Sequence, residues 1–459
     1  MDRRTLLRAA LLGAAAASLP VRPAAAAARA GASRKAPRPT GALVTRWDTD
    51  PWARGAYSAL PPGVSPTVRR TLAETVMGGR IVLAGEYASS GRPSTTTGAH
   101  DSGVAAARLI AGAAEPGRVI VIGAGMAGAT AAAELAARGT DVVVLEASDR
   151  VGGRIRTDRS WGAPIELGAS WIHGVRGNSV VPLASQAGLR LAPTDFEDAV
   201  ARDTLTGRRS PPAERRWARL DALLEELSGS KAPLGQDVAT WLAARGWGTG
   251  RIDAWAAQVE IAQEYGRDPD ALGVRATQEG DEYRGGDAMV VGGYVRIPEA
   301  LLAGVDVRLG SPVTAVTADR SGVDVSLADG SVERADAVVV AVPLEVLRTR
   351  AITVRPMHRE AATALGALRT GNLEKVVLRY AEPWWGDTQV IGVVGGGVPG
   401  APEGSAAALR WTEFYPLTNI VGEPAVMALS GGSSARRRPR SDAACAAEAA
   451  AALAAAFGR

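Results

Sequence analysis

One segment in the first third of the chain constrains the fold more strongly than any other. It begins with Arg118–Ile122, a β-branched run that predicts a buried parallel strand. The glycine-rich residues 123–128 follow at once, and an Ala-rich stretch that predicts a helix continues to about Arg138. Residues 141–145 predict a second strand, which ends at Glu146. This order predicts a βαβ unit that binds a dinucleotide.

The residue types in this unit suit a dinucleotide. Gly123, Gly125 and Gly128 permit a tight turn and a close approach of the pyrophosphate, and the amino end of the helix offsets its negative charge. Glu146 stands about twenty positions further on, where an acid accepts hydrogen bonds from the ribose. An acid at this point disfavours a 2′-phosphate, so FAD or NAD is expected and NADP is not.

Charge and residue usage exclude several other functions. The formal net charge is +4, yet residues 1–30 alone carry five Arg and one Asp, so the remainder is close to neutral. Basic runs around residues 208–216 and 436–440 are short and lack interleaved aromatics, so no nucleic-acid partner is expected. Cys445 is the single cysteine, which excludes an internal disulfide, and its Ala-rich surroundings favour a small buried residue. No Cys/His cluster has metal-ligand spacing, so no metal is expected.

Residues 1–30 have the layout of an export signal. Paired arginines at positions 3 and 4 precede a modest apolar stretch, and residues 28–30 fit an A-x-A cleavage site. This pattern is typical of a twin-arginine signal. A Sec signal or a membrane anchor is the alternative, although prolines and an arginine interrupt the apolar run. We expect a protein exported through the twin-arginine pathway, to the periplasm or the exterior.

A second glycine signature distinguishes FAD from NAD. Residues 150–154 read Arg-Val-Gly-Gly-Arg and resemble the second signature of the glutathione-reductase-like flavoproteins. In those proteins the arginine lies near the FAD pyrophosphate and the flavin, so the resemblance implies this place for Gly153 and Arg154. It favours FAD.

Further landmarks resemble the flavin-containing amine oxidases, the group that holds monoamine and polyamine oxidases. From residue 117 onward, after the glycine fingerprint, they follow in the family's usual order: Glu166–Gly174, Gly292–Tyr294, Val340–Pro343, Lys375–Leu378 and Trp384–Trp385. The segments that close the family's order stand at the front instead: Trp47, Arg54–Ser58, Arg80–Glu86 and Gly98–Gly103. Residues 38–113 thus resemble the family's carboxyl end and residues 117–459 the rest, as in a circular permutation.

A circular permutation is physically reasonable for this fold. The family's last helix ends near its first strand, so residues 112–117 can join the two, and new ends at an exposed connection leave the core contacts intact. A recombined or truncated gene product is the alternative. The two pieces are complementary, with no segment lost or repeated, which favours the permutation.

The resemblance implies an α+β fold of two domains, each assembled from separate pieces. A glutathione-reductase-like FAD-binding Rossmann domain with a parallel sheet would comprise residues 78–190 and 296–345. The amine-oxidase substrate domain, with a mixed or antiparallel sheet and helices, would comprise residues 39–77, 191–295 and 346–459. Residues of about 200–275 have helical spacing and are expected to form helices over the substrate entrance.

The resemblance also assigns residues to amine oxidation. Lys375 matches a lysine that holds a water near flavin N5, and an ammonium among apolar neighbours is costly without a partner or a function. Tyr57 matches one wall of an aromatic cage. The stretch that would supply the second ring holds no aromatic, so this wall is either missing or replaced, for example by Trp411 or Tyr415. Ala56 stands where monoamine oxidases bind FAD covalently through cysteine, which implies noncovalent FAD.

Other positions around the flavin follow from the same resemblance. Gly85 and Glu86 follow a predicted strand, and Glu86 matches a Glu of the family that contacts the ribityl region of the flavin. Residues 95–99 would begin a helix beside the pyrimidine ring, where backbone donors stabilise negative charge. The family's motif also places four consecutive residues at the cofactor: Gly168, Ala169, Ser170 and Trp171.

The choice of substrate depends on His173 and on nearby charges. In the form W-I-H-G, His173 resembles a histidine that faces the substrate tunnel of polyamine and spermine oxidases, though an ordinary core histidine is the alternative. L-amino acid oxidases need an arginine in this stretch for the carboxylate, and none occurs there, although Arg176 or Arg284 could supply the charge. Polyamines would need acidic residues along the tunnel, for which the candidates are Asp195, Glu197, Glu264, Glu279, Asp281 and Glu282.

The sequence therefore predicts an FAD-dependent amine oxidase. It would transfer a hydride from a primary or secondary, polyamine-like amine to the flavin, with O2 as the acceptor, and give an imine or aldehyde and H2O2. An L-amino acid oxidase or related monooxygenase is the alternative within the same superfamily. A flavin-binding protein without catalysis is the alternative of another class. The sequence does not specify the oligomeric state.

Overall fold

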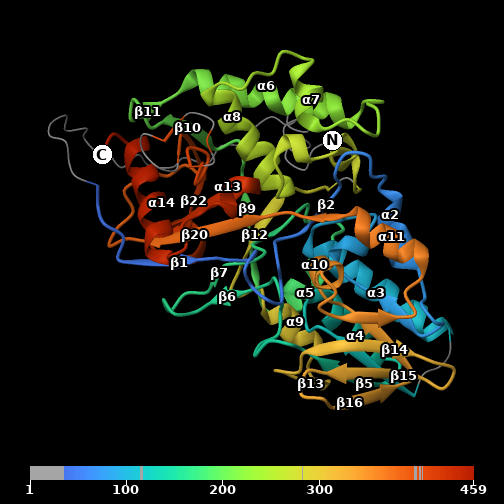
Figure 1. Ribbon diagram of the computed structural model, residues 1–459. Coiled ribbons are helices and arrows are strands. Elements are labelled where there is room, and N and C mark those ends of the chain that lie inside the picture. The colour runs from blue at the N-terminus through green and yellow to red at the C-terminus, as the bar shows by residue number, and fades with distance from the viewer. Residues whose placement is uncertain (1–35, 114–116, 282, 397–400, 403–404, 406) are drawn as a thin grey trace.

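The computed structural model describes residues 36–113, 117–281, 283–396, 401–402, 405 and 407–459. Two large sheets organise these residues, a parallel one low in the view of Figure 1 and a larger one at its upper left. The predicted signal at residues 1–30 and part of the 112–117 junction lie outside the described residues. Cys445 is buried, and no helix among the described residues is long and apolar enough to cross a membrane.

The parallel sheet contains the fingerprint unit. Its five strands, in spatial order, are β13 (Asp306–Arg308), β5 (Asp141–Leu145), β4 (Arg118–Ile122), β17 (Ala337–Val340) and β3 (Ile81–Leu83), and every pairing is parallel. Val119 and Val121 face α4 (Met126–Ala136) and α3 (Thr96–Ala113), while the alternate residues Ile120 and Ile122 face the other core. Burial on both faces explains why β4 reads as a continuous apolar run.

A four-stranded sheet extends this half of the molecule. It is formed, in spatial order, by β16 (Val332–Ala335), β15 (Val323–Leu327), β14 (Val313–Ala318) and β18 (Thr353–Arg355). Only β14 and β18 pair in parallel. In Figure 1, strands β14, β15 and β16 of this sheet are seen beside β5 and β13.

The larger sheet has seven strands. In spatial order they are β1 (Gly41–Val44), β20 (Leu373–Arg379), β23 (Ala425–Gly431), β22 (Glu413–Pro416), β21 (Val390–Val394), β10 (Ala199–Asp203) and β11 (Arg208–Arg209). Only β10 and β21 pair in parallel. Helix α14 (Asp442–Ala456) packs on the face that carries Val376 and Leu378. The alternate residues of β20, Lys375 and Val377, therefore face the interior.

Helices cover the other side of the seven-stranded sheet, across the top of Figure 1. They are α6 (Pro211–Ser228), α7 (Val238–Ala243) and α8 (Arg251–Ala257), and α8 continues as a π-helix, η2 (Gln258–Gln263). Trp217 of α6 and Trp255 of α8 are buried and meet edge to face. The helices predicted within residues 200–275 are thus present, whereas the π-helical turn was not predicted.

Smaller elements complete the fold. The three-stranded sheet consists of β8 (Trp171–Ile172), β12 (Asp287–Val291) and β9 (Arg190–Thr194). The two-stranded sheets pair β19 (Arg369–Thr370) with β2 (Ser58–Ala59), and β6 (Thr157–Asp158) with β7 (Ile165–Glu166). The remaining helices are α2 (Thr67–Glu74), η1 (Glu86–Ala88), α5 (Val180–Gln186), η3 (Pro269–Ala271), η4 (Val274–Gln278), α9 (Arg296–Leu301), α10 (Leu344–Arg348), α11 (Arg359–Ala367), α12 (Thr418–Val421) and α13 (Gly432–Arg436).

Candidate functional site

A cavity of about 930 Å³ lies between the carboxyl ends of β4 and β5 and the interior face of β20. Every residue that the sequence predicted for the cofactor or the chemistry lines it, except Gly128. These lining residues are Tyr57, Gly85, Glu86, Gly123, Gly125, Glu146, Gly153, Arg154, Gly168, Ala169, Ser170, Trp171, His173 and Lys375. The topology thus brings together residues that the sequence separates by more than three hundred positions.

The glycine turn has space for nothing larger than hydrogen at two positions. Gly123 has φ +101°, and a Cβ there would lie 2.8 Å from the backbone oxygen of Ala341. Gly128 does not line the cavity, because it lies inside α4 against the turn, where a Cβ would come within 1.9 Å of the Gly123 oxygen. Its role is therefore the close packing of helix on strand. The amino end of α4 is thereby held beside the cavity, as an anion requires.

Glu146 lies at the end of β5, as predicted. Its carboxylate accepts hydrogen bonds from the Ala124 nitrogen at 2.7 Å and from the Ser148 hydroxyl at 2.8 Å. The Ala124 donor lies in the glycine turn and the Ser148 donor in the loop after β5, so the acid is oriented within the cavity wall.

A charged chain connects the front segment of the sequence to the second glycine signature. Arg154 donates to the Ala56 oxygen at 2.7 Å and to Glu86 at 2.9 Å. The Ser58 hydroxyl donates to Glu86 at 2.6 Å, and Arg69 donates to that hydroxyl. Burial alone would raise the pKa of Glu86, but Arg154, Arg69 and Ser58 outweigh burial and hold the pKa below its usual value. Glu86 is therefore a buried anion at neutral pH.

Lys375 projects from β20 into the cavity wall. Its ammonium donates to the Gly168 oxygen and to the Ser170 hydroxyl, each at 2.5 Å, and lies 5.6 Å from the centre of the Trp171 ring. Burial lowers the pKa of Lys375 to about 7, although the nearby Glu166 favours the charged form. Burial also raises the pKa of Glu166 to about 7. Lys375 can therefore exchange a proton near neutral pH.

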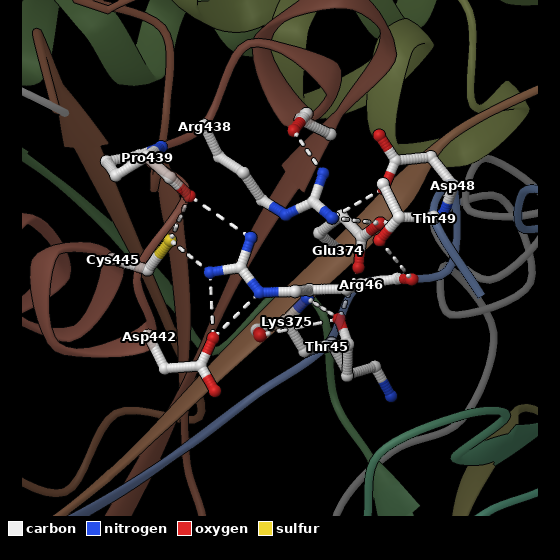
Figure 2. Close-up of polar contacts among 11 residues, drawn as sticks. Thr45, Arg46, Asp48, Thr49, Glu374, Lys375, Arg438, Pro439, Asp442 and Cys445 are labelled. Carbon is white, nitrogen blue, oxygen red and sulfur yellow. Dashed lines mark hydrogen bonds and ion pairs between the residues drawn. The ribbon is translucent and has the colours of Figure 1, made fainter.

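Lys375 is supported from the opposite face of β20 by residues that were not predicted from the sequence (Figure 2). The Thr45 hydroxyl accepts from the Lys375 backbone nitrogen at 2.7 Å and donates to Glu374 at 2.6 Å. Arg438 bonds Asp48 at 2.5 Å and lies 3.4 Å from Glu374. Burial raises the pKa of Glu374. The alternation of β20 implies that Glu374 and Lys375 face apart, but no sequence pattern indicated that Thr45 and Arg438 would meet them.

Two tyrosines stand in the cavity wall. Tyr57 donates from its hydroxyl to the Gln263 oxygen, at the end of the π-helix, at 2.5 Å. Tyr415 lies edge to face with Trp171, with ring centres 5.1 Å apart, and also meets Phe196. Trp411 is fully buried and does not line the cavity. Of the two replacements considered for the second ring, only Tyr415 is thus in place.

His173 also lines the cavity, and an acid orients it. Its Nδ1 lies 2.6 Å from a carboxylate oxygen of Asp287, whose other oxygen accepts from the Gly174 nitrogen at 2.9 Å. Asp287 is buried at the first position of β12. Its contact with Nδ1 leaves Nε2 as the ring nitrogen free to meet a ligand. Sequence reasoning missed Asp287, and an acid opening a buried strand was the available signal.

Few of the other charged residues that the sequence suggested for substrate binding line the cavity. Of the acids considered for polyamine binding, Glu264 lines the cavity, whereas Glu279 is engaged by Arg69 at 2.5 Å. Asp195, Glu197 and Asp281 do not line it, and Glu282 lies outside the described residues. Arg176 and Arg284 are joined through their backbones and likewise do not line the cavity. Among the described residues, no group of three or more His, Cys, Asp or Glu side chains could hold a metal ion.

A glycine turn at the end of a parallel strand, an acid one strand further and an adjoining cavity with a buried lysine are typical of an oxidoreductase that binds a dinucleotide. Sequence comparison specifies the class. The chain belongs to the family of flavin containing amine oxidoreductases, whose sequence pattern it matches over residues 21–111 and 126–459. It is accordingly a flavin-dependent enzyme that oxidises amines.

Similar proteins agree with this assignment. The chain is 29% identical over 355 residues to polyamine oxidase 4 of Oryza sativa subsp. japonica, which covers 70% of this chain and 69% of that protein. It is 30% identical over 345 residues to polyamine oxidase 3 of the same plant, with 68% and 67% covered. The fold is similar to that of wild-type putrescine oxidase bound to putrescine, with a TM-score of 0.56, 22% identity, and 73% of this chain and 81% of that chain covered.

Proposed function

We propose that the protein is a polyamine-type amine oxidase with noncovalent FAD, which converts a primary or secondary amine to an imine and then an aldehyde, with release of H2O2. The observation that carries the proposal is the meeting of Lys375, Tyr57, Tyr415 and the His173–Asp287 pair in one cavity with the glycine turn. The similarity to polyamine oxidases supports the substrate class.

The residues of the cavity fit FAD. The pyrophosphate would lie at Gly123 and Gly125, beside the amino end of α4, and the ribose at Glu146. Arg154 and the ionised Glu86 would hold the middle of the cofactor, and Thr95, Thr96 and Ala99 at the start of α3 would lie beside the flavin. When bound, FAD supplies the acceptor for the hydride and passes the electrons to O2. Ala56 cannot form a thioether, which supports noncovalent binding.

The amine must be neutral and held in one orientation when it reacts. The rings of Tyr57 and Tyr415 would position its apolar carbons, and Nε2 of His173 would bind its nitrogen and favour the neutral form. Lys375, with a pKa of about 7, can hold a water through its ammonium protons or take up a proton at Nζ. Glu264 would attract a second, protonated nitrogen of a polyamine.

An amino acid is a weaker candidate substrate. The described arginines that line the cavity are Arg150 and Arg154 of the second glycine signature and Arg156, two residues after it. Arg150 donates to the Gly153 oxygen and Arg154 to Glu86, so both guanidinium groups are already engaged on the cofactor side. A substrate carboxylate beside Lys375 would therefore meet no arginine clamp from the described residues.

We also propose the circular permutation. Strand β3 at the edge of the parallel sheet and strand β1 at the edge of the seven-stranded sheet both come from the front segment. The far end of the chain lies near β1. Thr40, just before β1, bonds the Arg379 oxygen, and the adjoining Tyr380 packs on Trp384. Trp384 in turn contacts Phe457 and Arg459. Export through the twin-arginine pathway is a further proposal, supported by residues 1–30 of the sequence alone.

A peroxide-coupled oxidase assay across polyamines, monoamines and L-amino acids tests the function. The purified protein should be yellow, release its FAD on denaturation, and turn over spermine-like amines fastest. Glu264→Gln should raise KM for polyamines more than for monoamines, because only polyamines carry a second cation. Turnover confined to L-amino acids would contradict the proposal, and a yellow protein that oxidises nothing would point to binding without catalysis.

A further inference from the structure

A second cavity, of about 550 Å³, adjoins the first and is lined by arginines. They come from five separate elements, namely the loop before β2, the turn after η2, the end of α10, β19 and the end of α13. The five residues are Arg54, Arg267, Arg348, Arg369 and Arg436. Asp50 and Pro51 line both cavities, so the loop that leads to Tyr57 separates them.

Four of these five guanidinium groups form no ion pair with a described residue. Arg54 donates to the Pro51 oxygen and the Thr349 hydroxyl, Arg267 to the Ala271 oxygen, and Arg369 to the backbone oxygens of residues 366–368. Arg436 donates from Nε to the side-chain oxygen of Asn372 at 3.3 Å. Within the described part of the chain, none of these four forms an ion pair.

The acids of this cavity are already engaged. Glu345 pairs with Arg348 at 2.7 Å and accepts from Thr370 at 3.1 Å. Asp48 is bonded by Arg438, and Asp50 accepts from the backbone nitrogens of residues 52 and 53. The second cavity is therefore lined by a surplus of positive charge.

Two further observations show that this surplus is costly in the folded protein. Burial, followed by the like charges of Arg436 and Arg369, lowers the pKa of Arg267 despite the nearby Asp268 and Asp270. The Nε atom of Arg348 is buried and meets no acceptor among the described residues. A buried donor without an acceptor costs free energy, and so do like charges held close together. An anion in the cavity would relieve the repulsion among Arg267, Arg369 and Arg436.

We propose that the second cavity binds a multivalent phosphate-type oxyanion, such as inorganic phosphate or pyrophosphate. Guanidinium groups bind phosphate oxygens in pairs of hydrogen bonds, and converging arginines from several elements are the arrangement such an anion requires. The bound anion would join Arg54 of the loop to Arg369 of β19 and Arg267 of the turn after η2. It would thereby fix the loop beside the first cavity.

The test is binding of pyrophosphate to the FAD-loaded protein, measured by equilibrium dialysis at constant ionic strength. FAD occupies the glycine turn in this form, so the turn cannot account for the binding, and an unchanged visible spectrum shows that FAD stays in place. We expect one pyrophosphate per chain. Inorganic phosphate should compete with it, whereas chloride should not.

Variants locate the site. Arg267→Gln/Arg369→Gln should weaken pyrophosphate binding about tenfold or more, since each charge-assisted contact is worth at least that factor. Arg219→Gln, at an exposed arginine of α6, is the control and should bind as the wild type does. If the double variant loses its FAD spectrum, Arg369→Lys keeps the charge and should still bind more weakly, because lysine cannot bond in pairs. No binding by the wild type, or equal binding by the arginine variants, would overturn the proposal.

Discussion

Lys375 is the residue whose environment is most specific. Its three hydrogen-bond partners are all acceptors: the oxygens of Glu166 and Gly168 and the hydroxyl of Ser170. Such a shell suits an ammonium, yet burial lowers the pKa of Lys375 to about 7. The side chain is thus held in place while its proton is loosely held, which is the condition for proton exchange with a water or a ligand.

We therefore predict that Lys375→Met slows amine oxidation by about a hundredfold or more, the usual scale of a positioned acid or base. FAD should remain bound, because Lys375 lies away from the glycine turn. Stopped-flow reduction of the flavin by the amine measures the effect. Lys231→Met, at an exposed position, is the matched control. A near-normal rate of reduction in Lys375→Met would remove Lys375 from the chemistry.

Glu166 gives a prediction for pH. Burial raises the pKa of Glu166 from 4.5 to about 7, so its contribution to stability is present below pH 4.5 and is lost as the pH rises toward 7. Glu166→Gln cannot ionise, but its side-chain oxygen can still accept from the Tyr294 nitrogen, while its NH2 group takes the place of the other oxygen and donates to the Thr157 hydroxyl. The variant should therefore gain on the wild type between pH 5 and pH 8, by up to about 3 kcal/mol. Urea unfolding at the two pH values measures the difference, and a constant difference would contradict the assigned pKa.

At this scale the sequence predicted the residues within motifs but not their partners. Lys375, Tyr57 and His173 were recognisable because short motifs surround them, and all three line the cavity. Asp287, Thr45 and Arg438 stand in no motif, and their positions depend on long-range pairing. A buried acid next to a lysine, such as Glu374, indicates that a partner exists but not which residue it is.

Among the elements, the βαβ unit was the most predictable. Strand β4, helix α4 and strand β5 form where the sequence predicted them, because glycines, a buried apolar run and a terminal acid act together. The π-helix η2 was not predictable, since an extra residue in a helical turn leaves the hydrophobic spacing almost unchanged. That turn nevertheless places the Gln263 oxygen against Tyr57. π-helical turns recur at functional sites for this reason.

Gly128→Ala tests the contact between the helix and the strand. The added methyl group would lie 1.9 Å from the Gly123 oxygen, so α4 must shift and carry its amino end away from the cavity. We expect weaker FAD binding, by at least about tenfold, and a loss of roughly 1 to 3 kcal/mol in stability. Fluorescence titration of the FAD-free protein measures the affinity.

Gly112→Ala is the matched control for this prediction. Gly112 lies in α3 with open space around its Cβ position, so alanine should leave FAD binding unchanged and stabilise the helix slightly. Normal FAD affinity in Gly128→Ala would show that α4 can move without affecting the cofactor.

The whole molecule can be tested by restoring the family's order. A chain that begins at residue 117, joins residue 459 to residue 38 through a short flexible linker and ends at residue 113 should fold to the same enzyme. We expect the same FAD spectrum, the same amine specificity and a similar melting temperature, because the contacts of β1 and β3 depend on their neighbours and not on chain order. A restored chain that binds no FAD would contradict the permutation.

At the level of the molecule, the motifs and their resemblance predicted the family, and sequence comparison confirmed it. The course of the chain between the two large sheets was predictable only through the resemblance, because short strands such as β1 and β3 have little pattern of their own. The second cavity was not predictable at all. Its arginines come from five elements and form no run in the sequence.

The placement of β1 and β3 also determines when these strands can pair during synthesis of the chain. Thr45, just after β1, bonds Glu374, which follows 329 residues later. At roughly 5 to 20 residues per second, a ribosome needs about 15 to 65 seconds to deliver that partner. Strand β1 waits that long for β20, and β3 waits for β17, since Ile81 pairs with Val338, 257 residues later. Neither strand can pair when it is first made. Because both strands are short and join only at an edge, they add to sheets that have already formed, and waiting exposes little pairing surface.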